Sequence, residues 1–166
     1  RRPLLVWERP YYPTYYIPVE DVRAKLVPTG ETRPSASLGP AEVLTVVTGR
    51  GEVAGAALRH RDAAEASVRD AVRLEWSAMD EWLEEEEPLL GHPRDPYSRI
   101  DVRETSRHVR VSIGGEAVAE TRRAKALFEA GLPPRWYFPR EDVRMDLLED
   151  SDSQTTCAYK GLASYW

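Results

Sequence analysis

The densest group of chemically reactive side chains lies near the C-terminus, in two neighbouring stretches of the chain. Arg140 and Lys160 carry positive charge beside tyrosines and a tryptophan. Such a set can hold an anionic or aromatic ligand by charge-assisted hydrogen bonds and stacking. The sequence therefore predicts a ligand-binding cleft, to which we assign Tyr137, Arg140, Asp142, Cys157, Tyr159, Lys160 and Trp166.

Two of these residues also suggest catalysis. Cys157 as a nucleophile needs a general base and an electropositive setting, and Lys160 supplies only the charge. No histidine is tied to this stretch by spacing, and free cysteine is among the most buried residue types. A buried structural cysteine is therefore favoured. An enzyme that uses the same cleft, with Lys160 or Cys157 as its reactive group, is the alternative.

The chain repeats itself at an offset of 121 residues. Residues 1–27 match residues 122–148 without a gap, and eleven of the 27 aligned pairs are identical. So long an ungapped match indicates a duplicated structural unit. Both copies keep the stretch Glu-Asp-Val-Arg, which favours a structural role for these four residues. We expect Asp142 to pair with a nearby arginine. Arg140, Cys157 and Lys160 lack counterparts in the first copy, so chemistry is favoured in the second.

The register of the repeat divides the chain into three segments. We predict a first repeat at residues 1–75, a helix and linker at 76–105, and a second repeat at 106–166. The first repeat lacks an upstream piece that the second has, and the second lacks a downstream piece that the first has. We therefore expect a fragment of a longer chain, with strand edges covered by other residues or by another chain.

Alternation of apolar and polar residues predicts mainly strands. Residues 109–121 read as a hairpin around Gly114-Gly115, and residues 42–56 repeat that logic around Gly49-Arg50-Gly51. Residues 136–138 predict a short aromatic strand that ends at Pro139. A helix is predicted from Ser77 into the acidic run 84–87, and a second helical stripe over 62–72.

Composition excludes several classes of protein. The chain has 23 basic and 28 acidic residues, a net charge of -5, one cysteine and three dispersed histidines. These counts argue against nucleic acid, an anionic membrane, a disulfide framework and a zinc site. No apolar run approaches the ~20 residues that span a bilayer. We expect a cytoplasmic protein with no metal and no cofactor, and self-association into a homo-oligomer stays open.

The N-terminal tyrosines form a second aromatic group. Tyr11, Tyr12, Tyr15 and Tyr16 resemble a carbohydrate platform by composition. Prolines are interleaved with them, and their repeat partner is the stretch LPPRWY. We therefore predict a buried aromatic layer.

Three stretches resemble a known family. Residues 106–121, 133–149 and 156–166 look like the motifs of the domain of unknown function family 427, and residues 76–102 resemble the linker of its tandem-domain bacterial members. The resemblance implies two small, mainly β domains of the β-tent type, built of antiparallel sheets, with a short helical segment between them. Paired Cys-x-x-Cys zinc sites of β-tent relatives have no counterpart here.

The family resemblance leaves the function open between classes. The leading prediction is a small polar or anionic ligand bound in a cleft of the second repeat. One alternative is an enzyme of unknown reaction, since the family is sometimes labelled nucleotidyltransferase-like. Another is a structural or protein-interaction module that uses the acidic helix and open strand edges.

Overall fold

The structure is a computed structural model that describes residues 3–166. It is mainly β, with 48% strand and 10% helix, as the sequence predicts. The chain divides into two compact units, residues 1–95 and 96–166, each described by itself below. Within residues 3–166 no helix is long and apolar enough to cross a membrane. The domain boundaries drawn from the sequence and the β-tent assignment stay predictions.

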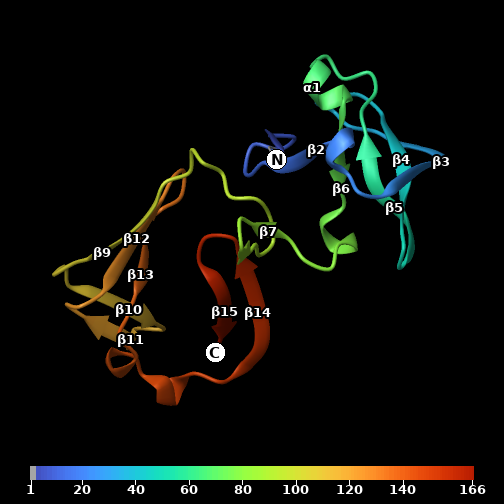
Figure 1. Cartoon of the computed structure of the whole chain (residues 1–166). Helices are drawn as coiled ribbons and strands as arrows, with labels where there is room; N and C mark the ends of the chain where they lie inside the picture. The colour runs from blue at the N-terminus through green and yellow to red at the C-terminus, as the bar shows by residue number, and fades with distance from the viewer. Residues whose placement is uncertain (1–2) are drawn as a thin grey trace. The chain divides into compact units, whose positions relative to one another are not determined.

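The first unit is built on one antiparallel sheet of six strands (Figure 1). Its strands in spatial order are β1 (Leu4–Val6), β2 (Thr14–Pro18), β6 (Ala71–Leu74), β5 (Gly51–Arg59), β4 (Ala41–Thr48) and β3 (Lys25–Arg33). The predicted hairpin around Gly49-Arg50-Gly51 is present as β4 and β5. The late strand β6 enters between β2 and β5, so residues distant in sequence meet in the middle of the sheet.

The core of the first unit gathers on its central strands. One buried cluster consists of Leu44, Val46, Ala56, Ala57 and Val72. These come from β4, β5 and β6, where apolar side chains leave water most completely. A second cluster joins the β2 residue Tyr16 to residues 63–71. The N-terminal hairpin is therefore anchored to the sheet by a buried tyrosine.

The second unit consists of three smaller antiparallel sheets. They are β10 (Val109–Ile113) with β11 (Glu116–Thr121), β13 (Arg135–Tyr137) with β12 (Lys125–Glu129) and β9 (Ile100–Glu104), and β14 (Ser151–Cys157) with β15 (Gly161–Tyr165). The predicted hairpin over 109–121 is confirmed. Gly114 and Gly115 have φ of 59° and 89°, the left-handed geometry that a two-residue hairpin turn requires.

The sequence repeat builds the same local structure twice. Leu4 lies opposite Tyr16 in β1 and β2, and Lys125 lies opposite Tyr137 in β12 and β13, at the same offset of 121 residues. A 3₁₀ turn follows each hairpin, η1 (Val19–Asp21) and η3 (Arg140–Asp142). A proline, Pro18 or Pro139, directly precedes each turn, and its ring nitrogen has no N–H to donate to a ladder hydrogen bond. The first two residues of the repeat, Arg1 and Arg2, lie outside the described residues.

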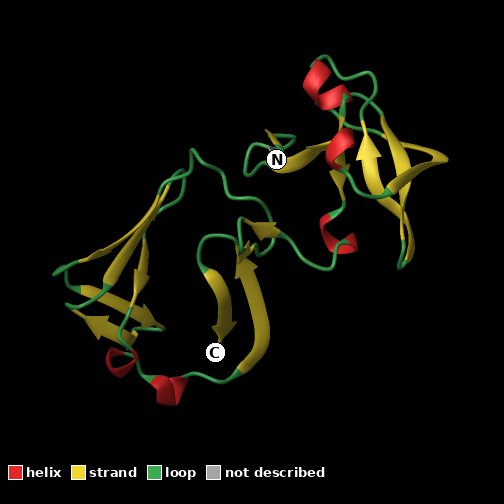
Figure 2. Cartoon of the chain, in the orientation of Figure 1, coloured by secondary structure: helices red, strands yellow, loops and turns green. Residues whose placement is uncertain are grey.

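The helix predicted from Ser77 is wrong. The structure has a single 3₁₀ turn, η2 (Trp76–Ala78), followed by a hairpin of β7 (Leu83–Glu84) and β8 (Glu87–Pro88) (Figure 2). Four consecutive glutamates at a helix C-terminus would repel one another and oppose the helix dipole. Glu85 instead adopts a φ of 54°, which turns the chain back.

The second predicted helical stripe is largely wrong as well. Only one turn forms, α1 (Ala66–Arg69), and Val72 lies in β6 instead of on a helix. Val72 is β-branched and completely buried between β2 and β5, so tertiary packing outweighs the local helical spacing.

The core assignment predicts a sharp contrast between two leucines of the first unit. Leu44→Ala removes a side chain that is 2% exposed, and we expect the free energy of unfolding to fall by about 3 kcal/mol. Leu83→Ala is the matched control, because Leu83 is 49% exposed on β7, and its effect should stay under about 1 kcal/mol. Urea unfolding, followed through the NMR amide signals of β4 and β5, measures both. Equal losses would contradict the core assignment.

Candidate functional site

A cavity of about 580 Å³ opens in the first unit. This volume lies within the range of small-molecule sites in proteins. Its wall is formed by segments that are far apart in sequence, including the loop after β1, the loop between β3 and β4, strand β6 and the 76–93 segment. The charged and aromatic members of the wall are Glu8, Arg9, Tyr12, Tyr15, Arg33, His60, Arg73, Glu75, Trp76, Trp82 and His92.

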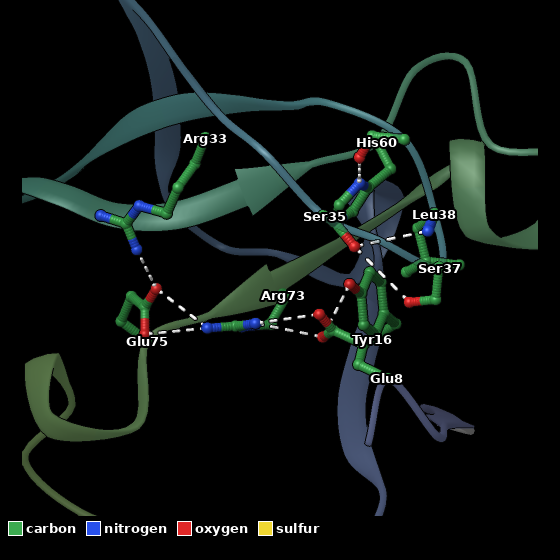
Figure 3. Close-up of polar contacts among 10 residues, drawn as sticks. Glu8, Tyr16, Arg33, Ser35, Ser37, Leu38, His60, Arg73 and Glu75 are labelled. Carbon is green, nitrogen blue, oxygen red and sulfur yellow. Dashed lines mark hydrogen bonds and ion pairs between the residues drawn. The ribbon is translucent and has the colours of Figure 1, made fainter. Parts of the chain in front are cut away.

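A chain of charged contacts runs along the cavity (Figure 3). The Arg73 guanidinium donates to both oxygens of Glu8, each at 3.1 Å, and to both oxygens of Glu75, at 3.1 and 3.2 Å. Arg33 donates to Glu75 Oε1 at 2.7 Å. The Tyr16 hydroxyl donates to Glu8 Oε1 at 3.0 Å. We call these five residues, Tyr16, Glu8, Arg73, Glu75 and Arg33, the arginine-glutamate network.

Burial and charge act together on the network. Burial works against the charge on Arg73, but the carboxylates of Glu8 and Glu75 outweigh it, so the pKa of the guanidinium is raised. The pKa of Tyr16 is raised strongly, first by burial and then by the negative charge of Glu8. Tyr16 therefore stays a neutral hydrogen-bond donor, and Arg73 stays a cation between two anions.

Aromatic rings line another part of the cavity. The indoles of Trp76 and Trp82 stack with centroids 4.6 Å apart, and Tyr15 stacks on Trp82 at 6.1 Å. Trp82 Nε1 donates to the Trp76 carbonyl at 3.0 Å, which fixes the pair. Tyr12 stacks on His92 at 4.2 Å. Such rings offer flat apolar contact area with a fixed orientation.

Only part of the predicted buried tyrosine layer exists. Tyr16 is completely buried, whereas Tyr12 and Tyr15 are partly exposed and belong to the cavity wall. Tyr11 is 78% exposed, so its assignment to a buried layer is wrong. Tyr11 follows a proline in a bend between β1 and β2, where alternation along a strand no longer decides which face a side chain takes.

The seven residues assigned to a cleft by sequence lie in the second unit. Their contacts divide them into local groups. The Arg140 guanidinium lies 5.6 Å from the Trp166 ring centroid, a cation–π contact. Lys160 Nζ donates to Glu129 Oε2 at 2.8 Å. Tyr137 is half exposed, and Cys157 and Tyr159 are partly buried. The cleft that would join all seven stays a prediction.

Asp142 takes the structural pairing that the sequence suggests. It accepts from Thr121 Oγ1 at 2.6 Å and from Arg123 at 3.0 Å. The hydrogen bond from Thr121, followed by the hydrogen bond and charge of Arg123, lowers the pKa of this carboxyl. Asp142 thus ties η3 to the end of β11.

The comparisons with known proteins give one match. The family model described as Domain of unknown function (DUF427) matches residues 1–85 and 101–166. The chain belongs to this family. Comparison with curated proteins and with solved structures gives no significant match. The two DUF427 segments fall one in each structural unit, and the family resemblance read from the sequence is confirmed.

In this DUF427 chain, several residues of the cavity wall were not predicted from the sequence as site residues. Arg73, Glu75, Trp76 and His60 belong to the unrepeated part of the first unit, so the repeat gave no reason to select them. One signal was available, since Arg73 lies in β6 and Glu75 continues the extended backbone two positions on, which places both on the same face. Within residues 3–166 no group of His, Cys, Asp or Glu is arranged to hold a metal ion.

The raised pKa of Tyr16 predicts how stability depends on alkaline pH. An unfolded tyrosine ionises near pH ~10, whereas folded Tyr16 stays protonated well above that pH. Its contribution is therefore complete below pH ~10 and is lost as the pH rises further, by about 1.4 kcal/mol per pH unit. We expect Tyr16→Phe to be less stable than the unchanged chain at neutral pH, with a gap that narrows above pH ~10.

The measurement is urea unfolding of the first unit at a series of alkaline pH values. Tyr11→Phe is the matched control, because Tyr11 is exposed and its loss should leave the pH dependence unchanged. A gap between Tyr16→Phe and the unchanged chain that stays constant with pH would contradict the assignment.

Proposed function

We propose that the chain binds a small polar or anionic molecule, and that the cavity of the first unit is its binding site. The observation that carries the proposal is the composition of one wall. A cavity of about 580 Å³ brings arginines, stacked indoles and a buried histidine together. Binding sites for small molecules combine apolar walls with a few convergent polar groups.

The charges of the cavity favour a negatively charged group. Three arginines (Arg9, Arg33, Arg73) and two glutamates (Glu8, Glu75) line it, for a net charge of +1. Arg33 is the network member best able to change partner, because its side chain is 51% exposed. An exposed ion pair contributes little net energy, so a ligand anion can compete with Glu75 for that guanidinium. Arg73, held by two carboxylates, stays in place.

The aromatic rings give the cavity a flat apolar surface on which a ring of the ligand can pack. Trp76, Trp82 and Tyr15 present flat surfaces whose orientation is fixed by stacking and by the Trp82 hydrogen bond. A planar or cyclic ligand gains contact area on such a wall at low entropic cost. The proposed ligand is therefore a small ring-bearing anion.

A second location for the same function is the predicted cleft of the second repeat. The contact between Arg140 and Trp166 supports it, because a cation over an indole can also receive an anion or a ring. Lys160 is less available, since its Nζ is paired with Glu129 Oε2 at 2.8 Å. The first unit is favoured, because its cations and rings line one cavity.

The two locations predict different responses to single substitutions. A panel of small anions, including aromatic carboxylates, sugar phosphates and mononucleotides, is screened by thermal shift, and the Kd of each hit is measured by NMR titration. Arg33→Ala should weaken binding about tenfold or more, the cost of one charge-assisted hydrogen bond. Arg50→Ala is the matched control, because Arg50 lies in the β4–β5 turn and does not line the cavity.

Lys160→Ala serves as the test of the second location. Loss of affinity in Lys160→Ala, with Arg33→Ala unchanged, would move the site to the second repeat. Absence of any hit across the panel would contradict the proposed function in both units.

A further inference from the structure

One side chain of the cavity wall, His60, is buried and has a hydrogen-bond partner at only one of its two ring nitrogens. His60 follows β5 and is 1% exposed, which makes it one of the most buried polar residues described. Its Nδ1 lies 2.9 Å from the Gly39 carbonyl oxygen (Figure 3). Its Nε2 is buried and, among residues 3–166, has no hydrogen-bond partner. A buried polar atom without a partner costs about 1–3 kcal/mol, so it calls for an explanation.

The Gly39 carbonyl decides which nitrogen of His60 carries the proton. A carbonyl oxygen only accepts, so Nδ1 must be the donor of that hydrogen bond. An imidazolium buried at 1% exposure would need an anionic partner, and no contact to a carboxylate is present among the described residues. The ring is therefore neutral, and Nε2 carries a lone pair that accepts a hydrogen bond.

The neighbouring hydroxyls have contacts of their own, and none of the described residues places a donor within hydrogen-bond distance of His60 Nε2. The Tyr16 ring lies 6.0 Å from the His60 ring, but the Tyr16 hydroxyl donates to Glu8. Ser35 Oγ accepts from the Leu38 backbone N–H at 3.3 Å and lies 3.5 Å from Ser37 Oγ. His60 belongs to the lining of the cavity, together with the cationic and aromatic groups already described, so its unpaired acceptor lies next to a ligand that enters there.

We propose that the ligand of this cavity donates a hydroxyl or N–H hydrogen bond to His60 Nε2. The ligand class is then a ring-bearing anion that also carries a hydroxyl or amino group. This inference rests on the proposed function and adds a specificity rule to it. A site that is built to pair with a hydroxyl rejects the analogue without it, because its buried acceptor is left unpaired.

The test compares benzoate with its three monohydroxy isomers, which share one ring and one carboxylate. At least one hydroxy isomer should bind about tenfold more tightly than benzoate, measured as Kd by NMR titration. The three isomers place the hydroxyl in different directions from the carboxylate. The preferred isomer therefore reports where Nε2 lies relative to the arginines.

The variant His60→Asn removes the acceptor Nε2 and keeps a donor for the hydrogen bond to the Gly39 carbonyl. Asn keeps an amide N–H near the position of Nδ1, able to donate to Gly39, and has no counterpart of Nε2. In His60→Asn the preference for the hydroxy isomer should vanish while benzoate still binds. His108→Asn is the matched control, because His108 lies in the second unit and is exposed.

A measurement on the unsubstituted chain guards against a variant that fails to fold. Long-range ¹H–¹⁵N NMR at neutral pH should show the His60 ring protonated on Nδ1 alone, with the Nε2 signal shifted when the hydroxy isomer binds. A ring protonated on Nε2, equal affinities for benzoate and all isomers, or a preference that survives in His60→Asn would overturn the inference while leaving the proposed function intact. If no member of the wider anion panel binds, the proposed function fails and this inference falls with it.

Discussion

The first unit depends on one guanidinium placed between two carboxylates. Arg73 lies on β6, Glu8 lies in the loop after β1, and Glu75 follows β6 directly. Two carboxylates that face each other at partial burial would repel, and each would lose its hydration. The arginine satisfies both with paired hydrogen bonds, so the loop after β1 is held against β6. The Tyr16 hydroxyl completes the shell of Glu8, and Tyr16 itself anchors β2 in a buried cluster.

The repeat position of Glu8 has different hydrogen-bond donors in the second unit. Glu129 is the counterpart of Glu8 at the offset of 121 residues, and it accepts from two cations, whereas Glu8 accepts from Arg73 and from the Tyr16 hydroxyl. Its donors are Lys160 at 2.8 Å, in the turn between β14 and β15, and Arg135 at 3.3 Å, in β13. The repeated glutamate is therefore paired with positive charge in both units, but the cations come from different residues. This explains why Lys160 is distinctive in sequence and yet already engaged in the structure.

Local features of the fold could be predicted because their causes are local. Alternating residues around Gly114-Gly115 specify a tight hairpin, and Pro139 ends the aromatic strand before η3. The helix expected from Ser77 failed for a non-local reason as well as for the local repulsion among its glutamates. Trp82 stacks on both Trp76 and Tyr15, and the Tyr15 contact joins the 76–93 segment to β2. Spacing within the segment cannot reveal that partner, so helical periodicity was a misleading signal there.

The candidate site was harder to predict than the fold, because the cavity wall has no motif. His60, Arg73 and Trp82 converge only when β6 enters the sheet between β2 and β5. Sequence reasoning chose the second copy because reactive residues are dense there, yet density along a chain is not proximity in space. Seven residues within 30 positions still divide into separate contacts in the second unit.

The repeated hairpin has a different environment in each unit. Tyr16 and Tyr137 occupy the same register in the two copies, but Tyr16 is 0% exposed and Tyr137 is 49% exposed. In the first unit β6 pairs with β2, and Ala63, Val68 and Ala71 form a buried cluster with that tyrosine, whereas β13 is the edge of its sheet. A two-stranded hairpin is too small to enclose a cavity alone. The cavity wall of the first unit forms where unrepeated segments pack on the hairpin. These segments contribute Arg73, the two indoles and His60 to the wall. Under the proposed function, binding specificity is therefore set by what packs against the repeated element.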